Sequence, residues 1–402
     1  MSDFGLQAAS DDGGYLRGLH RGSASGGSEA ATTRLLEIAD RACLHLTHLR
    51  DIQVLHSGDD HFEHLFRAIA NARREICIEM YQVRADPIGW RLCAALATAA
   101  SRGIEVRLLF DRFGSSAIKG WLATLEGHHV QVRWYGPWRP WNNPFRRTHR
   151  KLIVIDGAKA SIGGINMGSE FSELLSDENS WRDISLWFAG PAAWTMRRQF
   201  EAAWQAHGGT SSGPLSVPDG SGSLCAFSNP KTNGANQADA YRALIGTARR
   251  EVLLATPYFL PDAALRSAMQ DAARRGVRVR VVVPRRNDIW WFKHGSRRFY
   301  RHLLEAGVEI WERCDRMVHA KVGVADGLVA AVGSTNLNRL SFYGNSETLL
   351  LTTDPYVVTE IDSMLRGESL ASAERLSPRS WPLHPDRRPW AELAASTIAM
   401  IL

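Results

Sequence analysis

The chain of 402 residues contains few cysteines and no long apolar run. Its five cysteines are scattered and form no Cys-x-x-Cys pair, which argues against a disulfide framework and indicates a reducing compartment. No stretch approaches the ~20 apolar residues that cross a bilayer, and the N-terminus lacks the basic and apolar regions of a signal peptide. If this protein meets a membrane, we expect it to lie on the surface.

The excess of charge is also small. The formal net charge is +6 at pH 7 and the isoelectric point is near 9.2. This balance fits an anionic partner, either nucleic acid or an acidic membrane surface, without choosing between them. Hydrophobic residues make up 45% of the chain, which is enough for a full core and too many for a mainly disordered protein.

Two stretches of the sequence recur at nearly the same distance. The residues Ala-Arg-Arg-Glu at 72–75 return at 248–251, and 101–107 resembles 274–280, so the offsets are 248 − 72 = 176 and 276 − 103 = 173. A repeat this long is a duplicated domain, because solenoid units run to only about 20–50 residues. Strand-like and helix-like segments alternate, which favours an α/β fold in which each copy has a mixed, mainly parallel sheet flanked by helices.

Composition also indicates where the two copies begin and end. The first thirty or so residues are rich in Gly, Ser and Ala, and a second Gly- and Ser-rich stretch before residue 223 has the composition of a linker. We therefore predict an N-terminal tail with a helix, a first domain, a linker, a second domain and a C-terminal tail, over 1–50, 51–210, 211–222, 223–385 and 386–402.

Each copy carries the same pattern of histidine, lysine and aspartate. The members of the two patterns have identical spacing: His149, Lys151 and Asp156, then His319, Lys321 and Asp326. A histidine and a lysine two positions apart on a strand point to the same face. One such pattern is a weak signal, but two at matching places in a duplication exclude chance.

A glycine-rich turn with an asparagine follows each pattern, and an acidic residue follows each turn. The residues that we add to the predicted site are Asn166, Asp183, Ser334, Asn336 and Glu347. The first turn has Gly164 where the second has Ser334, so we expect the two halves to play unequal roles.

These residue types suit the chemistry of a phosphodiester. This group is anionic, so its site must supply positive charge and positioning, which two lysines and two asparagines can provide. One histidine can attack phosphorus and form a covalent intermediate, and the other can protonate the leaving alcohol. A carboxylate on each imidazole fixes its tautomer and raises its basicity. Because the lysines carry the positive charge, we predict no metal and no other cofactor.

The doubled pattern resembles that of the phospholipase D superfamily, over about residues 52 to 385. Within it, the stretches 78–81, 102–107, 256–261 and 333–336 are most similar to bacterial cardiolipin synthases of the short type, without membrane-spanning helices. The resemblance implies two phospholipase D-like domains with the active site at their pseudo-two-fold interface. It also implies a phosphatidyltransferase that makes cardiolipin from phosphatidylglycerol and a second phospholipid through a phosphohistidine, with His149 as the nucleophile and His319 as the general acid.

Other functions share the same residues. In a hydrolytic phospholipase D, water would be the acceptor, and the difference lies in the exclusion of water. The superfamily also includes nucleases, but the chain has no long basic stripe with interleaved aromatic residues, so we expect no nucleic acid as a partner. A non-catalytic binding module does not explain two intact patterns. The oligomeric state stays open.

Two aromatic and basic patches are candidates for membrane contact, the first with Trp138 and Trp141, the second with Trp290 and Trp291. Indole rings and arginines suit the headgroup layer of a membrane. A packed surface loop with stacked Arg–Trp pairs explains the first patch equally well. With the membrane interpretation, we expect peripheral binding to the cytoplasmic side of the cell membrane.

Overall fold

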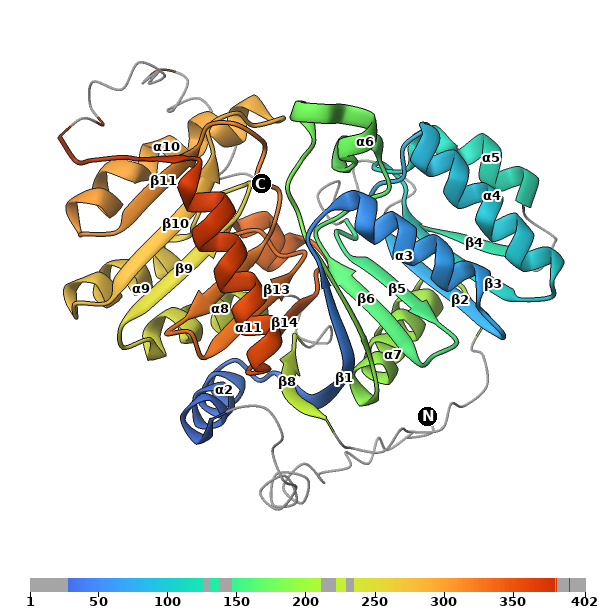
Figure 1. Ribbon diagram of the computed structural model, residues 1–402, viewed down its shortest axis with the longest axis horizontal. Coiled ribbons are helices and arrows are strands. Elements are labelled where there is room, and N and C mark those ends of the chain that lie inside the picture. The colour runs from blue at the N-terminus through green and yellow to red at the C-terminus, as the bar shows by residue number, and fades with distance from the viewer. Residues whose placement is uncertain are drawn as a thin grey trace, which may run out of the picture.

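A computed structural model of the chain describes residues 28–125, 130–136, 147–210, 222–228, 235–379, 381 and 390. Over these residues, fifteen strands form one mixed sheet, and helices pack against it (Figure 1). The predicted α/β fold with two similar halves is confirmed. Within the same residues, the structure contains no helix that is both long and apolar enough to cross a membrane.

The first half of the sheet is formed by one continuous segment of the chain. Its elements are β1 (His45–Leu55), α3 (Gly58–Ala70), β2 (Glu75–Met80), α4 (Pro87–Ser101), β3 (Glu105–Asp111), the short helix η2 (Ser116–Ile118), α5 (Lys119–Leu125), β4 (Val130–Tyr135), β5 (Lys151–Ile155), β6 (Lys159–Gly163), η3 (Ser169–Phe171), α6 (Glu173–Ser176), η4 (Asp177–Asn179), β7 (Ser185–Ala189) and α7 (Pro191–Ala206).

The second half repeats this order and adds one strand at its outer edge. Its elements are β8 (Ser223–Phe227), α8 (Ala235–Thr247), β9 (Glu251–Ala255), α9 (Ala263–Arg274), β10 (Arg278–Pro284), α10 (Trp290–Glu305), β11 (Glu309–Arg313), β12 (Val322–Ala325), β13 (Val329–Gly333), η6 (Leu340–Gly344), β14 (Leu349–Thr352), α11 (Pro355–Ser363), η7 (Met364–Leu370) and β15 (Ala373–Arg375).

The strand order shows the pseudo-two-fold symmetry directly. From the centre outward, one side runs β1-β7-β6-β5-β2-β3-β4 and the other runs β8-β14-β13-β12-β9-β10-β11, with β15 beyond it. The two central strands, β1 and β8, pair antiparallel and join the halves into one sheet. The strands within the two histidine patterns, β5 and β12, therefore occupy equivalent places in the two halves.

The direction of the strands corrects one part of the predicted fold. We expected a mainly parallel sheet, but ten of the fourteen pairings between described strands are antiparallel. Strand–helix–strand crossovers give only two parallel pairs in each half, β2 with β3 with β4 and β9 with β10 with β11. The remaining pairings of each half are antiparallel, and a short turn connects the two strands in β5–β6 and in β12–β13.

The two copies use the same local signals to begin their helices. Asp86 precedes α4 and Asp262 precedes α9, and each carboxylate accepts a hydrogen bond from a backbone N–H three residues later, at 3.0 Å from Gly89 and 2.7 Å from Leu265. Such N-caps satisfy amide groups that have no partner within the helix. These caps fix where each crossover helix starts above the sheet.

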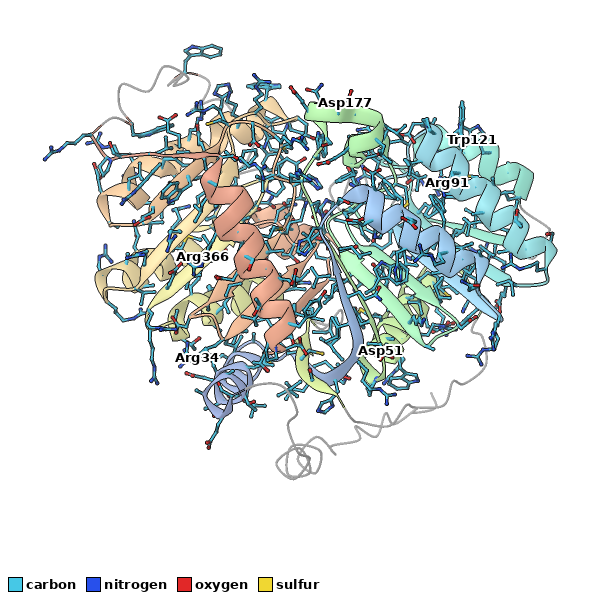
Figure 2. All side chains as sticks on the ribbon, viewed as in Figure 1. Arg34, Asp51, Arg91, Trp121, Asp177 and Arg366 are labelled. Carbon is cyan, nitrogen blue, oxygen red and sulfur yellow. The ribbon has the colours of Figure 1, made fainter. Side chains whose placement is uncertain are left out.

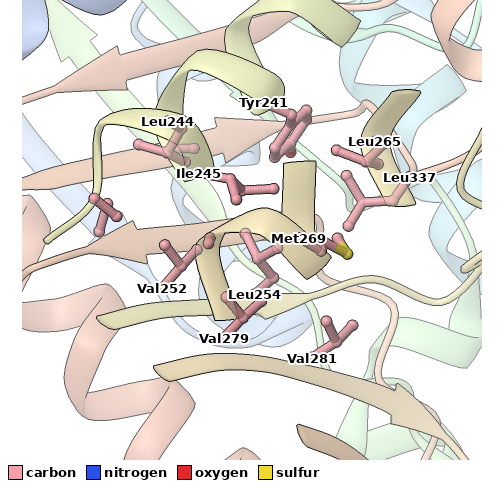
Figure 3. Close-up of a cluster of buried hydrophobic side chains, with 14 of the residues drawn as sticks. Tyr241, Leu244, Ile245, Val252, Leu254, Leu265, Met269, Val279, Val281 and Leu337 are labelled. Atoms are coloured by element: carbon pink, nitrogen blue, oxygen red, sulfur yellow. The ribbon is translucent and has the colours of Figure 1, made fainter. Parts of the chain in front are cut away.

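The N-terminal helix α2 (Glu29–Arg41) precedes the first half in sequence but packs against the second half. Its buried Leu35 and Ile38 belong to the same apolar cluster as the α8 residues Tyr241 and Leu244. Figure 3 shows part of this cluster, where α8 residues meet side chains of β9 and β10 such as Val252 and Val281. In Figure 1, α2 accordingly lies beside β8 at the lower edge of the sheet.

Candidate active site

The two histidine patterns lie at the same edge of the sheet. His149 comes two residues before β5 starts at Lys151, and His319 stands at the equivalent place before β12. Strand β5 runs antiparallel to β2, with Lys151 opposite Met80, so the histidine lies near the carboxyl end of β2. The two histidine and two lysine side chains are buried. The fold therefore brings the histidines and lysines of the two patterns to one buried site.

Each histidine is paired with a carboxylate from the other half of the chain. The Nδ1 atom of His149 lies 3.0 Å from Oε2 of Glu347, and Nδ1 of His319 lies 2.6 Å from Oδ2 of Asp183. The predicted carboxylate on each imidazole is thus supplied across the interface between the halves. Sequence spacing could not reveal this exchange, since the partners are 198 and 136 residues apart.

Backbone hydrogen bonds reinforce the same exchange. The N–H of His149 donates to the carbonyl of Ser346 at 2.8 Å, and the N–H of His319 donates to the carbonyl of Arg182 at 2.7 Å. Ser346 and Arg182 directly precede the two partner carboxylates in sequence. Each histidine is consequently held by both the main chain and the side chain of one segment of the opposite half.

The hydrogen bonds of His149 fix its tautomer. Its Nδ1 faces two acceptors, Oε2 of Glu347 at 3.0 Å and the carbonyl of Ser334 at 3.1 Å. A ring nitrogen between two acceptors must carry the proton, which leaves the Nε2 lone pair free. A neutral imidazole in this tautomer has its nucleophilic nitrogen directed away from the carboxylate.

His319 has different surroundings. Besides the short contact with Asp183, its Nδ1 lies 2.8 Å from Nζ of Lys321, and the same Nζ lies 3.5 Å from the Asp183 carboxylate. Burial and the neighbouring Lys321 lower the pKa of His319 to about 3, and burial also lowers the pKa of His149. Both imidazoles are therefore neutral at pH 7 until an anion enters the site and raises their proton affinity.

The two lysines are buried, and the charge of Lys321 acts on Lys151. Nζ of Lys151 donates to the carbonyl of His149 at 2.7 Å, and Nζ of Lys321 donates to the carbonyl of His319. Burial lowers the pKa of Lys151 to about 7 and that of Lys321 to about 8, although Glu347 and Asp183 oppose this lowering. A bound anion would favour the charged forms, so the pair is suited to hold a phosphate.

The polar residues of the two turns are buried, and Ser334 reaches the histidine–carboxylate pair of His149. Asn166 and Asn336 are buried, and Oδ1 of Asn166 has no hydrogen-bond partner among the described residues. Ser334 donates its hydroxyl to Oε2 of Glu347 at 2.5 Å. Although burial alone would raise it, the pKa of Glu347 is lowered by His149, Lys151 and this hydroxyl. Ser334 therefore helps to keep the partner of His149 ionised.

The equivalent turn of the first half has no room for a side chain. A Cβ atom at Gly164 would lie 2.2 Å from Oδ2 of Asp183. The shorter carboxylate, Asp183, stands against a glycine, whereas the longer one, Glu347, takes a hydrogen bond from Ser334. The two histidine–carboxylate pairs thus differ in a way that the predicted asymmetry of the turns had indicated.

Comparison with known proteins identifies the family. A family model described as "Cardiolipin synthase, PLD-like domain" matches residues 65–204 and 241–367, and so covers both halves. This chain belongs to that family. The predicted resemblance to the phospholipase D superfamily and to cardiolipin synthases is therefore confirmed.

Several proteins of this family resemble the chain over most of its length. Cardiolipin synthase A of Pseudomonas entomophila is 32% identical over 327 residues, which cover 79% of this chain and 68% of that protein. A cardiolipin synthase of a Geobacillus species is 33% identical over 312 residues, which cover 74% of this chain and 62% of that protein. The crystal structure of phosphatidylserine synthase from Haemophilus influenzae has the same fold, with a TM-score of 0.66 at 16% identity over 93% of this chain and 99% of the other.

In this member of the cardiolipin synthase family, the aspartates of the two patterns lie away from the histidines. Asp156 follows the far end of β5, where its carboxylate accepts hydrogen bonds from the backbone N–H groups of residues 73–75, at 2.7–3.1 Å. Asp326 accepts equivalent bonds from residues 249–251 at 2.8–2.9 Å. Seven residues of extended chain separate His149 from Asp156, about 23 Å. This placement corrects the prediction that the two aspartates are catalytic.

Aromatic residues that were absent from the predicted site line both histidines. The Tyr81 ring lies 5.1 Å from that of His149, and the rings of Trp181 and Phe171 lie 5.1 Å and 5.3 Å from that of His319. Tyr81 and Tyr258 hold matching places in the duplicated sequence, and this match is the signal by which the sequence could have assigned Tyr81 to the site. These rings contribute to the burial that shifts the pKa values of the site.

The predicted membrane-contact residues are only partly described. Trp138 and Trp141 lie outside the described residues. Trp290 is 56% exposed at the start of α10, whereas Trp291 is half-buried and stacks on Phe292 with ring centres 3.9 Å apart. Over the described part of the chain, no group of three or more His, Cys, Asp or Glu side chains is arranged to hold a metal ion.

Proposed function

We propose that this protein is a phosphatidyltransferase that makes cardiolipin from phosphatidylglycerol and a second phospholipid. The observation that carries the proposal is the pair of buried histidines, each oriented by a carboxylate, beside two lysines. Such a site offers a nucleophile, a proton donor and positive charge for one phosphodiester. The names of the relatives, cardiolipin synthases of two bacterial groups, supply the substrate class.

In the first proposed step, Nε2 of His149 attacks the phosphorus of phosphatidylglycerol. A P–N bond forms, the P–O bond to the headgroup glycerol breaks, and His319 in its protonated form gives that oxygen a proton. The tautomer of His149 supports the nucleophilic role, because its Nδ1 proton is engaged by Glu347. The short contact with Asp183 supports the acid role, because an adjacent carboxylate stabilises an imidazolium.

In the second proposed step, a hydroxyl of the acceptor lipid attacks the phosphohistidine. The acceptor oxygen forms a new P–O bond, the P–N bond to His149 breaks, and the hydroxyl proton passes to His319. Lys151 and Lys321, with Asn166 and Asn336, hold the non-bridging oxygens through both steps. Asp156 and Asp326 act at a distance, by tying the far ends of β5 and β12 to the strands beside them.

The proposal includes peripheral attachment to the cytoplasmic side of the cell membrane, with phospholipid and not nucleic acid as the partner. A lipid with two acyl chains stays in the bilayer, so the site must come to the surface. Exposed apolar side chains support this, since Phe113 follows β3, Leu174 stands on α6 and Trp290 starts α10. In Figure 1, α6 and α10 lie along the upper edge, where the halves meet. The cysteines, which are free, fit a reducing compartment.

The test is to incubate the purified protein with vesicles of labelled phosphatidylglycerol, and separately with labelled single-stranded DNA. We expect labelled cardiolipin and free glycerol from the vesicles and intact DNA. Phosphatidic acid as the main product would make the protein a hydrolase. Cleavage of DNA without lipid turnover would reject the proposal in favour of a nuclease.

A further inference from the structure

A tyrosine–aspartate pair stands beside the site without a role in the steps proposed above. Tyr258 follows the carboxyl end of β9, and its ring lies nearly perpendicular to the His319 ring, with ring centres 6.2 Å apart. Its hydroxyl donates to the carboxylate of Asp288, whose oxygens lie 2.9 Å and 3.0 Å away. Asp288 follows the neighbouring strand, β10, so both residues belong to the strand ends that surround the site.

The pair is held firmly in place. The Tyr258 ring stacks on Phe292 of α10 with ring centres 4.5 Å apart, and Tyr258 itself is buried. The side chain of Asn287 donates to the carbonyl of Pro257 at 2.8 Å, which ties the loop before α10 to the segment that carries Tyr258. Asp288 is an exposed residue, although partial burial of its carboxylate raises the pKa of that group. The tyrosine thus holds a carboxylate on a residue that solvent reaches.

Among the described residues of the first half, the aspartate at the end of β3 has different surroundings. Asp111 ends β3, but it is fully buried, and its carboxylate accepts the N–H groups of Phe113, Gly114 and Thr148 at 2.9–3.2 Å. Those bonds hold Asp111 to its own loop and to Thr148. Asp288 accepts the Tyr258 hydroxyl and backbone N–H groups of its own loop, but it is exposed, and an ionised carboxylate has about four lone-pair positions. Of these two aspartates, Asp288 on the His319 side is exposed and Asp111 is buried.

Charge decides what such a group can bind. Asp288 acts on the site electrostatically, since burial lowers the pKa of Lys321 and Asp288 is one of the carboxylates that oppose this lowering. A carboxylate repels the phosphate and accepts hydrogen bonds, so it suits a ligand with O–H groups. In the proposed reaction, His319 gives a proton to the alcohol that leaves and takes one from the alcohol that attacks. Both alcohols therefore lie beside His319, and their other hydroxyl groups lie on the same side of the site as Asp288.

We propose that Asp288, positioned by Tyr258, binds the free hydroxyls of a glycerol headgroup, both when glycerol leaves the donor and when the glycerol of an acceptor lipid attacks. The inference rests on the proposed function. Within that function, Asp288 and Tyr258 would make the enzyme prefer a polyol to a simple alcohol or to water. The bonds made and broken are those of the two steps above, and Asp288 takes no proton from them.

The test is a competition between two acceptor alcohols, glycerol and 1-propanol, with a phosphatidyl-nitrophenol donor whose leaving group needs no hydroxyl contact. The ratio of phosphatidylglycerol to phosphatidylpropanol formed is independent of how much enzyme is folded. We expect Asp288→Asn to lower this ratio about tenfold, because hydrogen bonds to a charged group are lost. Asp288→Glu should restore part of it, and Tyr258→Phe should lower it less. Asp271→Asn, on the exposed face of α9, is the matched control.

Two further outcomes are informative. An unchanged ratio in Asp288→Asn overturns the inference. Ethanolamine is tested as a third acceptor, and if Asp288→Asn lowers transfer to ethanolamine but not to glycerol, Asp288 binds an ammonium group and the inference is wrong. If the wild-type protein only hydrolyses its donors, transferase activity fails as a proposal, and the subsite is tested on the donor side instead. Cleavage of phosphatidylglycerol relative to phosphatidylpropanol should then fall about tenfold in Asp288→Asn, and an unchanged ratio overturns the inference there too.

Discussion

At the scale of single residues, each histidine is paired with a carboxylate, but the other groups around the two rings differ. His149 shares its Nδ1 proton between Glu347 and a carbonyl, whereas His319 has Asp183 and the ammonium of Lys321 at the same ring nitrogen. The first arrangement suits a nucleophile with a fixed lone pair. The second suits a group that gains and loses a proton.

The first prediction concerns these two roles. We expect His149→Ala and His319→Ala each to abolish turnover of phosphatidylglycerol, because one removes the nucleophile and the other the proton donor. Rapid acid-free quenching followed by mass spectrometry should find the phosphatidyl adduct on His149 in the wild-type protein. An adduct on His319 would reverse the two roles and leave the rest of the mechanism unchanged.

The second prediction is a pH dependence set by the lysines. Burial lowers the pKa of Lys151 to about 7 and that of Lys321 to about 8, from an ordinary value of 10.5. Since kcat/KM reports the free enzyme, it should fall as the pH rises above about 8 and the lysines lose their charge. A profile that stays flat up to pH 10 would show that the lysines remain charged in the empty site.

The same shifts have the opposite effect on stability. Between about pH 7 and 10.5, the unfolded chain keeps protons on these two lysines that the folded protein has lost. Their contribution to the free energy of unfolding therefore rises with pH across this window. Activity and stability should diverge above pH 8, which thermal melts at the same pH values can measure.

At the scale of elements, α2 reaches from the start of the chain to the second half. Arg34 on α2 is buried, and its Nη1 lies 2.9 Å from Oδ2 of Asp326. Asp156, the counterpart of Asp326, is held by the equivalent backbone N–H groups without a helix like α2. Figure 2 shows Arg34 at the lower edge of the molecule and Asp177, next to α6, at the upper edge.

The third prediction tests this contact. Arg34→Met should lower the free energy of unfolding by about 1–3 kcal/mol, since it removes a charged hydrogen bond and leaves Asp326 with its backbone donors. Activity below the melting transition should stay near that of the wild type, because Arg34 lies at the edge opposite the site. Arg41→Met on the same helix is the control, since its pair with Glu37 is exposed and worth less than about 1 kcal/mol. Equal melting temperatures for the two variants would contradict the prediction.

Parts of the fold and of the site could be predicted from the sequence, and other parts could not. The duplication, the crossover helices and the approach of the two patterns were predictable, because caps such as Asp86 and Asp262 and the repeated spacing are local signals. The exchange of Glu347 and Asp183 was not, since it depends on how two halves pack. The separation of Asp156 from His149 follows from the length of the strand between them, so the spacing in the sequence is enough to place Asp156 outside the site. The antiparallel majority was not predictable either, because most of these pairings, such as β2 with β5 and β1 with β7, join strands that are distant in sequence.

At the scale of the whole molecule, the fourth prediction concerns the membrane. Replacing Trp138 and Trp141 with Ala should weaken binding to anionic vesicles and lower turnover on bilayers, because indole rings favour the interface. Turnover of a short-chain, water-soluble phosphodiester should be largely spared. Trp194→Ala is a suitable control, since this residue lies on α7, away from the strand ends that surround the site. Equal losses on both substrates would show that Trp138 and Trp141 serve the pocket.

The exchange of carboxylates between halves bears on the origin of the chain. A single half with this geometry lacks the partner for its own histidine, so it could have worked only as a homodimer with two-fold symmetry. In a homodimer, every change at the site appears twice. A single chain is free of that restriction, and this one has Gly164 with Asp183 on one side and Ser334 with Glu347 on the other. A substitution in one half can therefore change the surroundings of one imidazole and leave the other as it is.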